Sequence, residues 1–328
     1  MGRRRPQAFL IRLALLVGAA IACAALAVQP APAQPPREPP LRAARWVAGG
    51  EPARVLTEQP TECLAAPADP TLAWSVEVGR AVFRSPTFLG GQAARAGIAC
   101  ETCHRNGRSN PNFAFPGVSG EPGTADVTSS LFSSHRGDGQ DNPRPIPDLS
   151  RPPGAFKISR SADSADLQAF VHGLVTEEFD GHEPPAAALK GLADYVRQIS
   201  ASACPAGLVQ PLTPAAALED ARRAVRAAQK AIGFNDNDTA LALVDAARST
   251  LGLIDERYGA RGLEKERNLL RTASLDLGSA QSAVRRGVNA GVMLDLWLAR
   301  SAGLQAALEK SQARSYYNRD VLAVALGG

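Results

Sequence analysis

Residues 100–104 hold the motif that most constrains this chain. Cys100, Cys103 and His104 spell C-x-x-C-H, which occurs once among the 328 residues. Two cysteines three positions apart share one helical turn, so both thiols reach the two vinyl groups of one haem. The histidine that follows can bind the iron from the proximal side. The spacing therefore predicts one haem c per chain, attached through Cys100 and Cys103, with His104 as the proximal ligand of the iron.

Two other kinds of site use closely spaced cysteines. A structural zinc site needs a second pair of ligands, and only Cys63 and Cys204 remain downstream of the N-terminal region. A thioredoxin-like redox pair lies in a βαβ unit, which the hydrophobic pattern of this chain does not indicate. Covalent haem is therefore the favoured interpretation, and no metal beyond the haem iron is expected.

The N-terminus has the pattern of a secretory signal peptide. Three arginines at 3–5 precede an apolar run over 9–28, and Ala31-Pro32-Ala33 fits a cleavage site. We expect residues 1–33 to be removed and the protein to be periplasmic. The alternative is an uncleaved anchor in the inner membrane with the rest of the chain facing the periplasm, because the run is long enough to span a bilayer.

Removal of the signal peptide also changes the charge of the chain. Residues 1–33 contain four arginines and no acidic residue, so cleavage brings the formal net charge from +4 to zero. A neutral chain lacks the basic surface that nucleic-acid binding requires. Nucleic acid is therefore not an expected partner.

Two cysteines remain once the signal peptide and the C-x-x-C-H motif are set aside. Cys63 and Cys204 are far apart in the sequence, and thiols in an oxidising periplasm form disulfides. We predict a Cys63–Cys204 disulfide, while two unpaired thiols stay an alternative that the sequence leaves open.

The chain divides into a linker, a haem domain and a bundle. Residues 34–68 are rich in Pro and Ala and predict a linker or a loosely draped arm. Residues 69–204 predict an all-α, loop-rich domain with the plan of a class I cytochrome c, in which loops over 105–160 wrap the haem. Residues 213–325 predict four amphipathic helices in an antiparallel bundle.

Hydrophobic spacing supports these helices. The expected buried faces are Leu72, Val76, Gly79 and Phe83; Leu167, Phe170, Val171 and Leu174; Leu189, Leu192, Val196 and Ile199; and, in the bundle, Leu218, Ala221, Val225, Ala228 and Ile232, then Leu241, Val244, Leu251, Ile254 and Tyr258, then Leu263, Leu270, Leu277 and Val284, and last Val292, Leu296, Leu304 and Leu308. The third bundle helix repeats every seven residues, which is typical of a bundle seam.

The sixth ligand of the iron is less constrained. Electron carriers often use Met, but Met293 is the one methionine of the mature chain and falls in the bundle, where a core role is expected. His135, in a polar loop 31 residues beyond His104, is the first candidate. An open or water-ligated iron comes next, followed by His172 and His182.

Residues 70–200 resemble one haem domain of the bacterial di-haem cytochrome c peroxidase and methylamine-utilisation-type family. The matching pieces are "VGRAVFRSPTFLGG" before "CETCH", then "HRGDGQDNPRPIPDL" and "LADYVRQI". In that family, a His followed by Gly-rich residues and Pro-Arg-x-x-Pro supplies the distal ligand. The resemblance thus implies His135, with Pro143, Arg144 and Pro147 completing the motif. This chain departs from the family pattern in two places: Pro145 replaces a common Asn, and the spacing from His135 to Pro143 is longer. The C-terminal bundle lies outside the resemblance.

The number of motifs separates two functions. A di-haem peroxidase has two C-x-x-C-H motifs, whereas this chain has one. We therefore expect an electron-transfer cytochrome with an unidentified redox partner and the bundle as a candidate docking domain. The alternative is a haem enzyme that reduces hydrogen peroxide, and a haem-dependent sensor is a third hypothesis.

Two further groups of residues bear on these functions. The peroxidase alternative would use Glu177, Glu178 or Asp180 for acid–base work, although a solvated helix end is the simpler interpretation of all three. Arg144 is the main candidate to meet a haem propionate, and Arg105 and Arg108 are others, each equally well interpreted as surface charge.

Overall fold

The computed structural model describes residues 38–205 and 207–327. The predicted signal peptide, and with it the alternative membrane anchor, lies outside these residues. Within them, no helix is both long and apolar enough to cross a membrane. The described residues from Pro39 onward form one compact unit.

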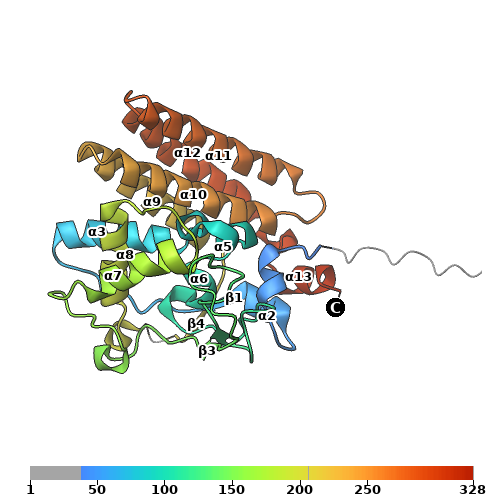
Figure 1. The fold of residues 1–328 in the computed structure, drawn as a ribbon. Helices are drawn as coiled ribbons and strands as arrows, with labels where there is room; N and C mark the ends of the chain where they lie inside the picture. The colour runs from blue at the N-terminus through green and yellow to red at the C-terminus, as the bar shows by residue number, and fades with distance from the viewer. Residues whose placement is uncertain (1–37, 206, 328) are drawn as a thin grey trace, which may run out of the picture. The chain divides into compact units, whose positions relative to one another are not determined.

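The described residues are mostly helical, which confirms the all-α fold class, and they contain two small antiparallel sheets, β1–β4 and β2–β3. The elements in chain order (Figure 1) are η1 (Arg42–Trp46), α2 (Pro52–Thr57), β1 (Glu58–Pro60), α3 (Pro70–Phe83), α4 (Pro86–Leu89), α5 (Gly91–Ala96), α6 (Cys100–Cys103), η2 (Arg105–Gly107), β2 (Thr124–Ala125), β3 (Arg144–Pro145), η3 (Pro153–Ala155), α7 (Asp166–Gly173), η4 (Leu174–Glu178), α8 (Ala186–Gln198), η5 (Ala201–Ala203), β4 (Val209–Pro211), α9 (Pro214–Gly233), α10 (Asn237–Arg257), α11 (Glu264–Arg285), α12 (Gly291–Ser311), η6 (Gln312–Arg314) and α13 (Arg319–Ala325).

Helices α3 and α8 cross at a pair of glycines. The Asp69 side chain caps α3 by accepting from the Leu72 N–H at 2.7 Å. A Cβ on Gly79 would lie 1.9 Å from the Gly191 carbonyl oxygen, so the two backbones touch where no side chain fits. One turn further along α3, the ring of Phe83 packs 5.0 Å from that of Tyr195 in α8. This crossing fixes the two longest helices that precede the C-terminal bundle.

The region between these helices is dominated by loops, as predicted. A small hydrophobic cluster forms its interior: Leu89, Ala93, Ile98, Val118, Phe132, Val175 and Phe179 are buried there. One expected core position differs, because Phe170 is 47% exposed on α7 while Leu167 and Val171 are buried. A helix of eight residues buries only a narrow stripe here, and Phe170 lies beside it.

The C-terminal helices form the predicted bundle. Helix α9 packs against α10 and α12, and α11 packs against both α10 and α12, which closes the four into a ring (Figure 1). The seven-residue seam of α11 is confirmed, since Leu263, Leu270, Leu277 and Val284 are all buried.

The register of α12 is different from the expected one. Val292 and Leu296 are about half exposed, and Leu294 and Trp297 are buried in their place. Both rows continue at helical spacing to the buried Leu304 and Leu308. The prediction was therefore wrong by part of a turn at the start of the helix.

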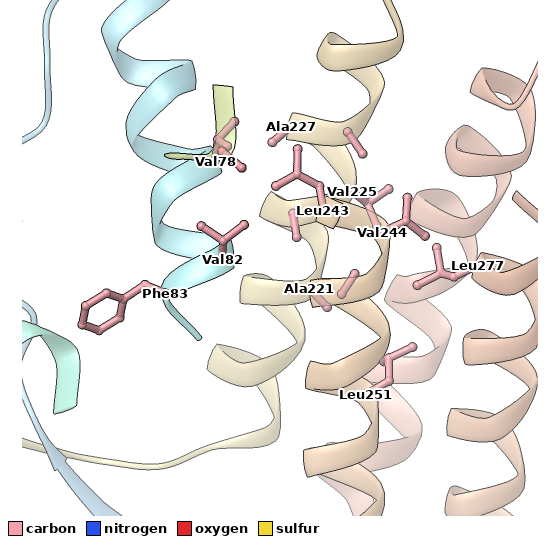
Figure 2. Packing of buried hydrophobic residues seen from close by; sticks show 14 of the residues in the cluster. Val78, Val82, Phe83, Ala221, Val225, Ala227, Leu243, Val244, Leu251 and Leu277 are labelled. Atoms are coloured by element: carbon pink, nitrogen blue, oxygen red, sulfur yellow. The ribbon is translucent and has the colours of Figure 1, made fainter. Parts of the chain in front are cut away.

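The helices before the bundle and the bundle itself share one hydrophobic core. Figure 2 shows Val78 and Val82 of α3 facing the side of α9 and α10 that carries Ala221, Ala227 and Leu243, and all five side chains are buried. The two predicted regions, 69–204 and 213–325, are thus joined by packing and not only by the chain between them.

Residues 39–60 differ from the linker expected over 34–68. They form η1, α2 and β1, and β1 pairs with β4. Leu41, Ala53 and Leu56 are buried together with Leu322 of α13. Leu322 lies more than two hundred residues away from these side chains, so the local hydrophobic pattern of the sequence could not predict this packing.

The predicted disulfide is confirmed. Cys63 and Cys204 are joined Sγ to Sγ, and the loop that they close spans 141 residues. Next to the bond, the Ser200 N–H donates to the Cys63 carbonyl at 2.8 Å. The covalent link therefore ties the segment before α3 to the segment after α8.

Glu62 lies beside the disulfide in a network of buried charges. Its carboxylate accepts hydrogen bonds from Arg80 at 3.0 Å, from Arg84 at 2.8 Å and from the Tyr195 hydroxyl at 2.6 Å. Burial alone would raise the pKa of Glu62, but the charges of Arg84 and Arg80 outweigh it and lower the pKa to about 2. The carboxylate is therefore ionised in the native state down to low pH.

This network predicts that the free energy of unfolding falls at acidic pH. In the unfolded chain Glu62 titrates near its ordinary pKa of 4.5, so its stabilising contribution is complete above that pH and is lost as the pH falls towards 2. The loss is at most about 3 kcal/mol. Urea unfolding of wild type and Glu62→Gln should give a stability difference that shrinks over this window, whereas the exposed Glu121→Gln should leave the pH profile of wild type unchanged.

Candidate haem attachment site

The two cysteines of the motif lie on the single turn of α6. The turn is held at its start by the Ala99 N–H, which donates to the Thr102 hydroxyl at 3.0 Å. Cys100 and Cys103 are unpaired and half-buried. Burial raises the pKa of each thiol to about 12. Both are thus thiols at neutral pH, unlike the low-pKa cysteines of thioredoxin-like redox pairs.

Cys100 lies where the two hydrophobic regions meet. It packs against the small cluster that contains Ile98 and Val175, and also against the main core. Leu149 and Ile158, from the loops after the motif, are half-buried against that same core. The thiol therefore faces apolar surroundings suited to a large hydrophobic group.

His104 follows the turn with its ring already oriented. Its Nδ1 lies 3.0 Å from the carbonyl oxygen of Pro147. A carbonyl only accepts, so Nδ1 carries the proton and Nε2 keeps a free lone pair. Metal-bound histidines are typically held in this way, with the second ring nitrogen donating to a backbone carbonyl. Burial lowers the pKa of His104 to about 4, so the ring is neutral at pH 7, as an iron ligand must be.

The segment that carries Pro147 is itself anchored. Arg108 forms an ion pair with Asp148 at 2.7 Å, and the Leu149 N–H donates to the Gly107 carbonyl at 2.9 Å. These two contacts fix the chain on both sides of the motif. The sequence contains Pro147 within the Pro-Arg-x-x-Pro piece, but the role of its carbonyl follows only from the fold.

The predicted propionate partners separate into two groups. Arg105 donates to the carbonyls of Val55 at 2.9 Å and Glu58 at 2.6 Å, and Arg108 is engaged with Asp148. Arg144 is exposed on β3. Arg144 therefore stays the propionate candidate, while the other two have partners within the protein.

His135 lies in an exposed loop. Its side chain is 65% exposed, and its Nε2 lies 3.8 Å from an Asp180 carboxylate oxygen. The loop is tied down by Ser134, whose N–H donates to Asp180 at 2.9 Å. Among the described residues, the polar contacts of the His135 ring are with Asp180 and not with the motif. Its role as distal ligand stays a prediction.

The other candidate ligands have partners elsewhere. His172 pairs with Glu183 at 2.8 Å, and His182 is exposed. Met293 is partly buried against the bundle core, which agrees with the expected core role. No group of three or more His, Cys, Asp or Glu side chains that could hold a metal ion occurs within the described residues.

The acidic residues after α7 are not all solvated, which corrects one interpretation. Glu178 ends the π-helical turn η4 and is 7% exposed, and its Oε2 has no hydrogen-bond partner among the described residues. Burial raises its pKa, although Arg136 lies 3.4 Å away. Glu177 and Asp180 are partly exposed, as expected of a helix end.

Comparison of the chain with protein-family models, with curated proteins and with solved structures finds no match.

Proposed function

We propose that the protein is an exported c-type cytochrome with a class I-like haem domain, which binds one haem covalently and transfers electrons to or from a redox partner. The observation that carries the proposal is the hydrogen bond from His104 Nδ1 to the Pro147 carbonyl, directly after a turn that presents Cys100 and Cys103. Two thiols on one turn and a neutral, oriented imidazole are what covalent haem attachment requires.

Each residue of the motif would have a separate role in binding the haem. Cys100 and Cys103 would form the two thioether bonds, and the free Nε2 of His104 would bind the iron, held in place by Pro147. Bound haem supplies a one-electron couple between ferrous and ferric iron. The apolar side chains that pack around Cys100 would limit the solvent exposure of a bound haem, and solvent exposure is one of the factors that set its reduction potential.

We propose His135 as the distal ligand. The first support is the sequence, in which a Gly-rich loop after His135 is followed by Pro143, Arg144 and Pro147. The second is that the nearest carboxylate oxygen, on Asp180, lies 3.8 Å from the His135 Nε2, which is too far for a hydrogen bond. If haem is bound, His135 as its second imidazole would lower the reduction potential relative to a His/Met cytochrome and would compete with peroxide for the iron.

Optical spectra of the oxidised and reduced protein test this assignment. Wild type is expected to be low-spin in both states, and His135→Ala to become high-spin when oxidised. His182→Ala, which removes an exposed histidine, should leave the spectrum unchanged. A low-spin spectrum in all three proteins would rule out His135 as the ligand.

A peroxide-reducing enzyme is the second candidate, because of Glu178. A buried carboxyl group with a raised pKa and a free oxygen is suited to general acid–base work. This function needs an iron that accepts peroxide, so it predicts a high-spin wild-type spectrum and donor oxidation that Glu178→Gln abolishes. An unchanged haem spectrum after addition of hydrogen peroxide would exclude it.

A further inference from the structure

Helix α12 presents a second apolar row that the bundle does not bury. Val292 and Leu296 are about half exposed, and the row continues at spacings of three and four residues through Ala299, Gly303 and Ala306, all of which are exposed. These spacings are those of the a and d positions of a heptad repeat. Helix α12 is therefore apolar on two sides, one of which faces the bundle and the other solvent.

A helix that is apolar all round is normally buried all round. The neighbouring helix shows an ordinary solvated face, since the exposed side of α11 carries Lys265, Asn268, Arg271 and Thr272. The exposed row of α12 has no polar side chain over about four turns. Helix α12 packs against α9 and α11 on its other sides (Figure 1). An uncovered apolar row of this length is typical of a surface that binds another protein.

Two charged side chains lie on the edges of this row. Asp295 accepts from the Gln229 amide of α9 at 2.6 Å, and Arg300 lies 3.5 Å from Asp276 of α11. The acidic edge of the row is therefore the one beside α9, and the basic edge is the one beside α11. The Arg300 side chain is 71% exposed, so its guanidinium can also reach a second partner.

The spacing of these two charges indicates which partner fits the row. In a pair of parallel heptad helices, the residue before an a position faces the residue five places further along the partner helix. Asp295 and Arg300 are separated by this interval, so Asp295 of each copy would face Arg300 of the other. An antiparallel pair would instead bring basic edge against basic edge and acidic edge against acidic edge. A second copy of this chain, packed in parallel, therefore matches the row in both apolar spacing and charge.

We propose that the exposed row of α12 is the contact between two copies of this chain, whose α12 helices pack in parallel about a two-fold axis. Val292 and Leu296 fill the start of the contact, and the small residues Ala299, Gly303 and Ala306 let the helices approach closely towards its end. Gly303→Ala also fits this contact, since the row already carries alanine on both sides. One helix face is a small interface, so the dimer is expected to be reversible. The contact uses none of the proposed haem-binding side chains and is independent of the proposed electron transfer.

Sedimentation velocity of the mature holoprotein at increasing concentration tests the proposal. Wild type is expected to pass from monomer to dimer. Leu296→Glu should weaken dimerisation by at least about a hundredfold, because two leucines leave the contact and two carboxylates enter it. Leu275→Glu is the matched control, since Leu275 is exposed on α11 outside the row, and it should dimerise like wild type. A wild type that stays monomeric, or a dimer that survives Leu296→Glu, would overturn the proposal.

Single cysteines test the parallel geometry. The native Cys63 and Cys204 are already joined to each other. Leu296→Cys and Ala306→Cys, about 15 Å apart along the helix, should each form a disulfide-linked dimer under mild oxidation, while Leu275→Cys should not. Parallel helices place each position of the row opposite itself, whereas antiparallel helices can do so for at most one of these two positions. Cross-linking at one position alone, or at neither, would overturn the parallel pairing.

Discussion

A protein with both Cys100→Ala and Cys103→Ala is expected to carry no covalent haem. The two thiols are the unpaired cysteines of the described chain, and they share one turn beside an oriented His104. Without them no thioether bond can form, so the loss should be complete and not a reduction in occupancy. The measurement is the haem content that survives extraction in acidified acetone, which removes haem that is not covalently bound.

The matched control removes the other two cysteines. Cys63→Ala with Cys204→Ala deletes the same number of sulfurs but breaks the disulfide. This variant should keep its covalent haem and lose stability, because the bond closes a long loop in the unfolded chain. Equal haem content in both double variants would argue against attachment at α6.

Gly79→Ala is expected to destabilise the protein by about 3 kcal/mol or more. The new Cβ would lie 1.9 Å from the Gly191 carbonyl oxygen and 2.3 Å from its carbonyl carbon. Both atoms belong to the α8 backbone, so relief requires the two helices to separate and their shared core to open. Helix propensity alone would favour the alanine by about 1 kcal/mol, and the sign of the effect is therefore diagnostic of the crossing.

A glycine in open space provides the comparison. Gly303 lies on the exposed side of α12, with no atom within 4 Å of the position that a Cβ would take. Gly303→Ala should stabilise the protein by about 0.5–1 kcal/mol. Urea unfolding of the two variants measures both effects, and a Gly79→Ala protein as stable as wild type would contradict the close approach of α3 and α8.

Local patterns in the sequence identified the helices where one apolar stripe dominates. The seven-residue repeat of α11 has no competing row, and its four positions are all buried. Helix α12 has two overlapping apolar rows, one through Val292 and Leu296 and one through Leu294 and Trp297. Only the packing of α12 against α9 and α11 selects the second row, and tertiary contacts of this kind are absent from a local pattern.

The candidate site also contains features that the local sequence predicts and features that depend on contacts between distant segments. Cys100, Cys103 and His104 lie within five residues of the sequence, so their spacing alone predicted that one helical turn carries both thiols next to the histidine. The Pro147 carbonyl lies 43 positions from His104, and the burial of Glu178 depends on how η4 packs against the loops before it. These features depend on contacts between distant segments, as does the packing of Leu56 on α13.

The most direct test of the central claim is the mass of one peptide. Trypsin cleaves after Arg95 and Arg105, which releases residues 96–105 with the whole C-x-x-C-H motif. Peptide mass spectrometry of the protein purified from a periplasmic extract should find this peptide carrying the mass of one haem and no free thiol. The unmodified peptide, or one in which Cys100 and Cys103 form a disulfide with each other, would contradict the assignment.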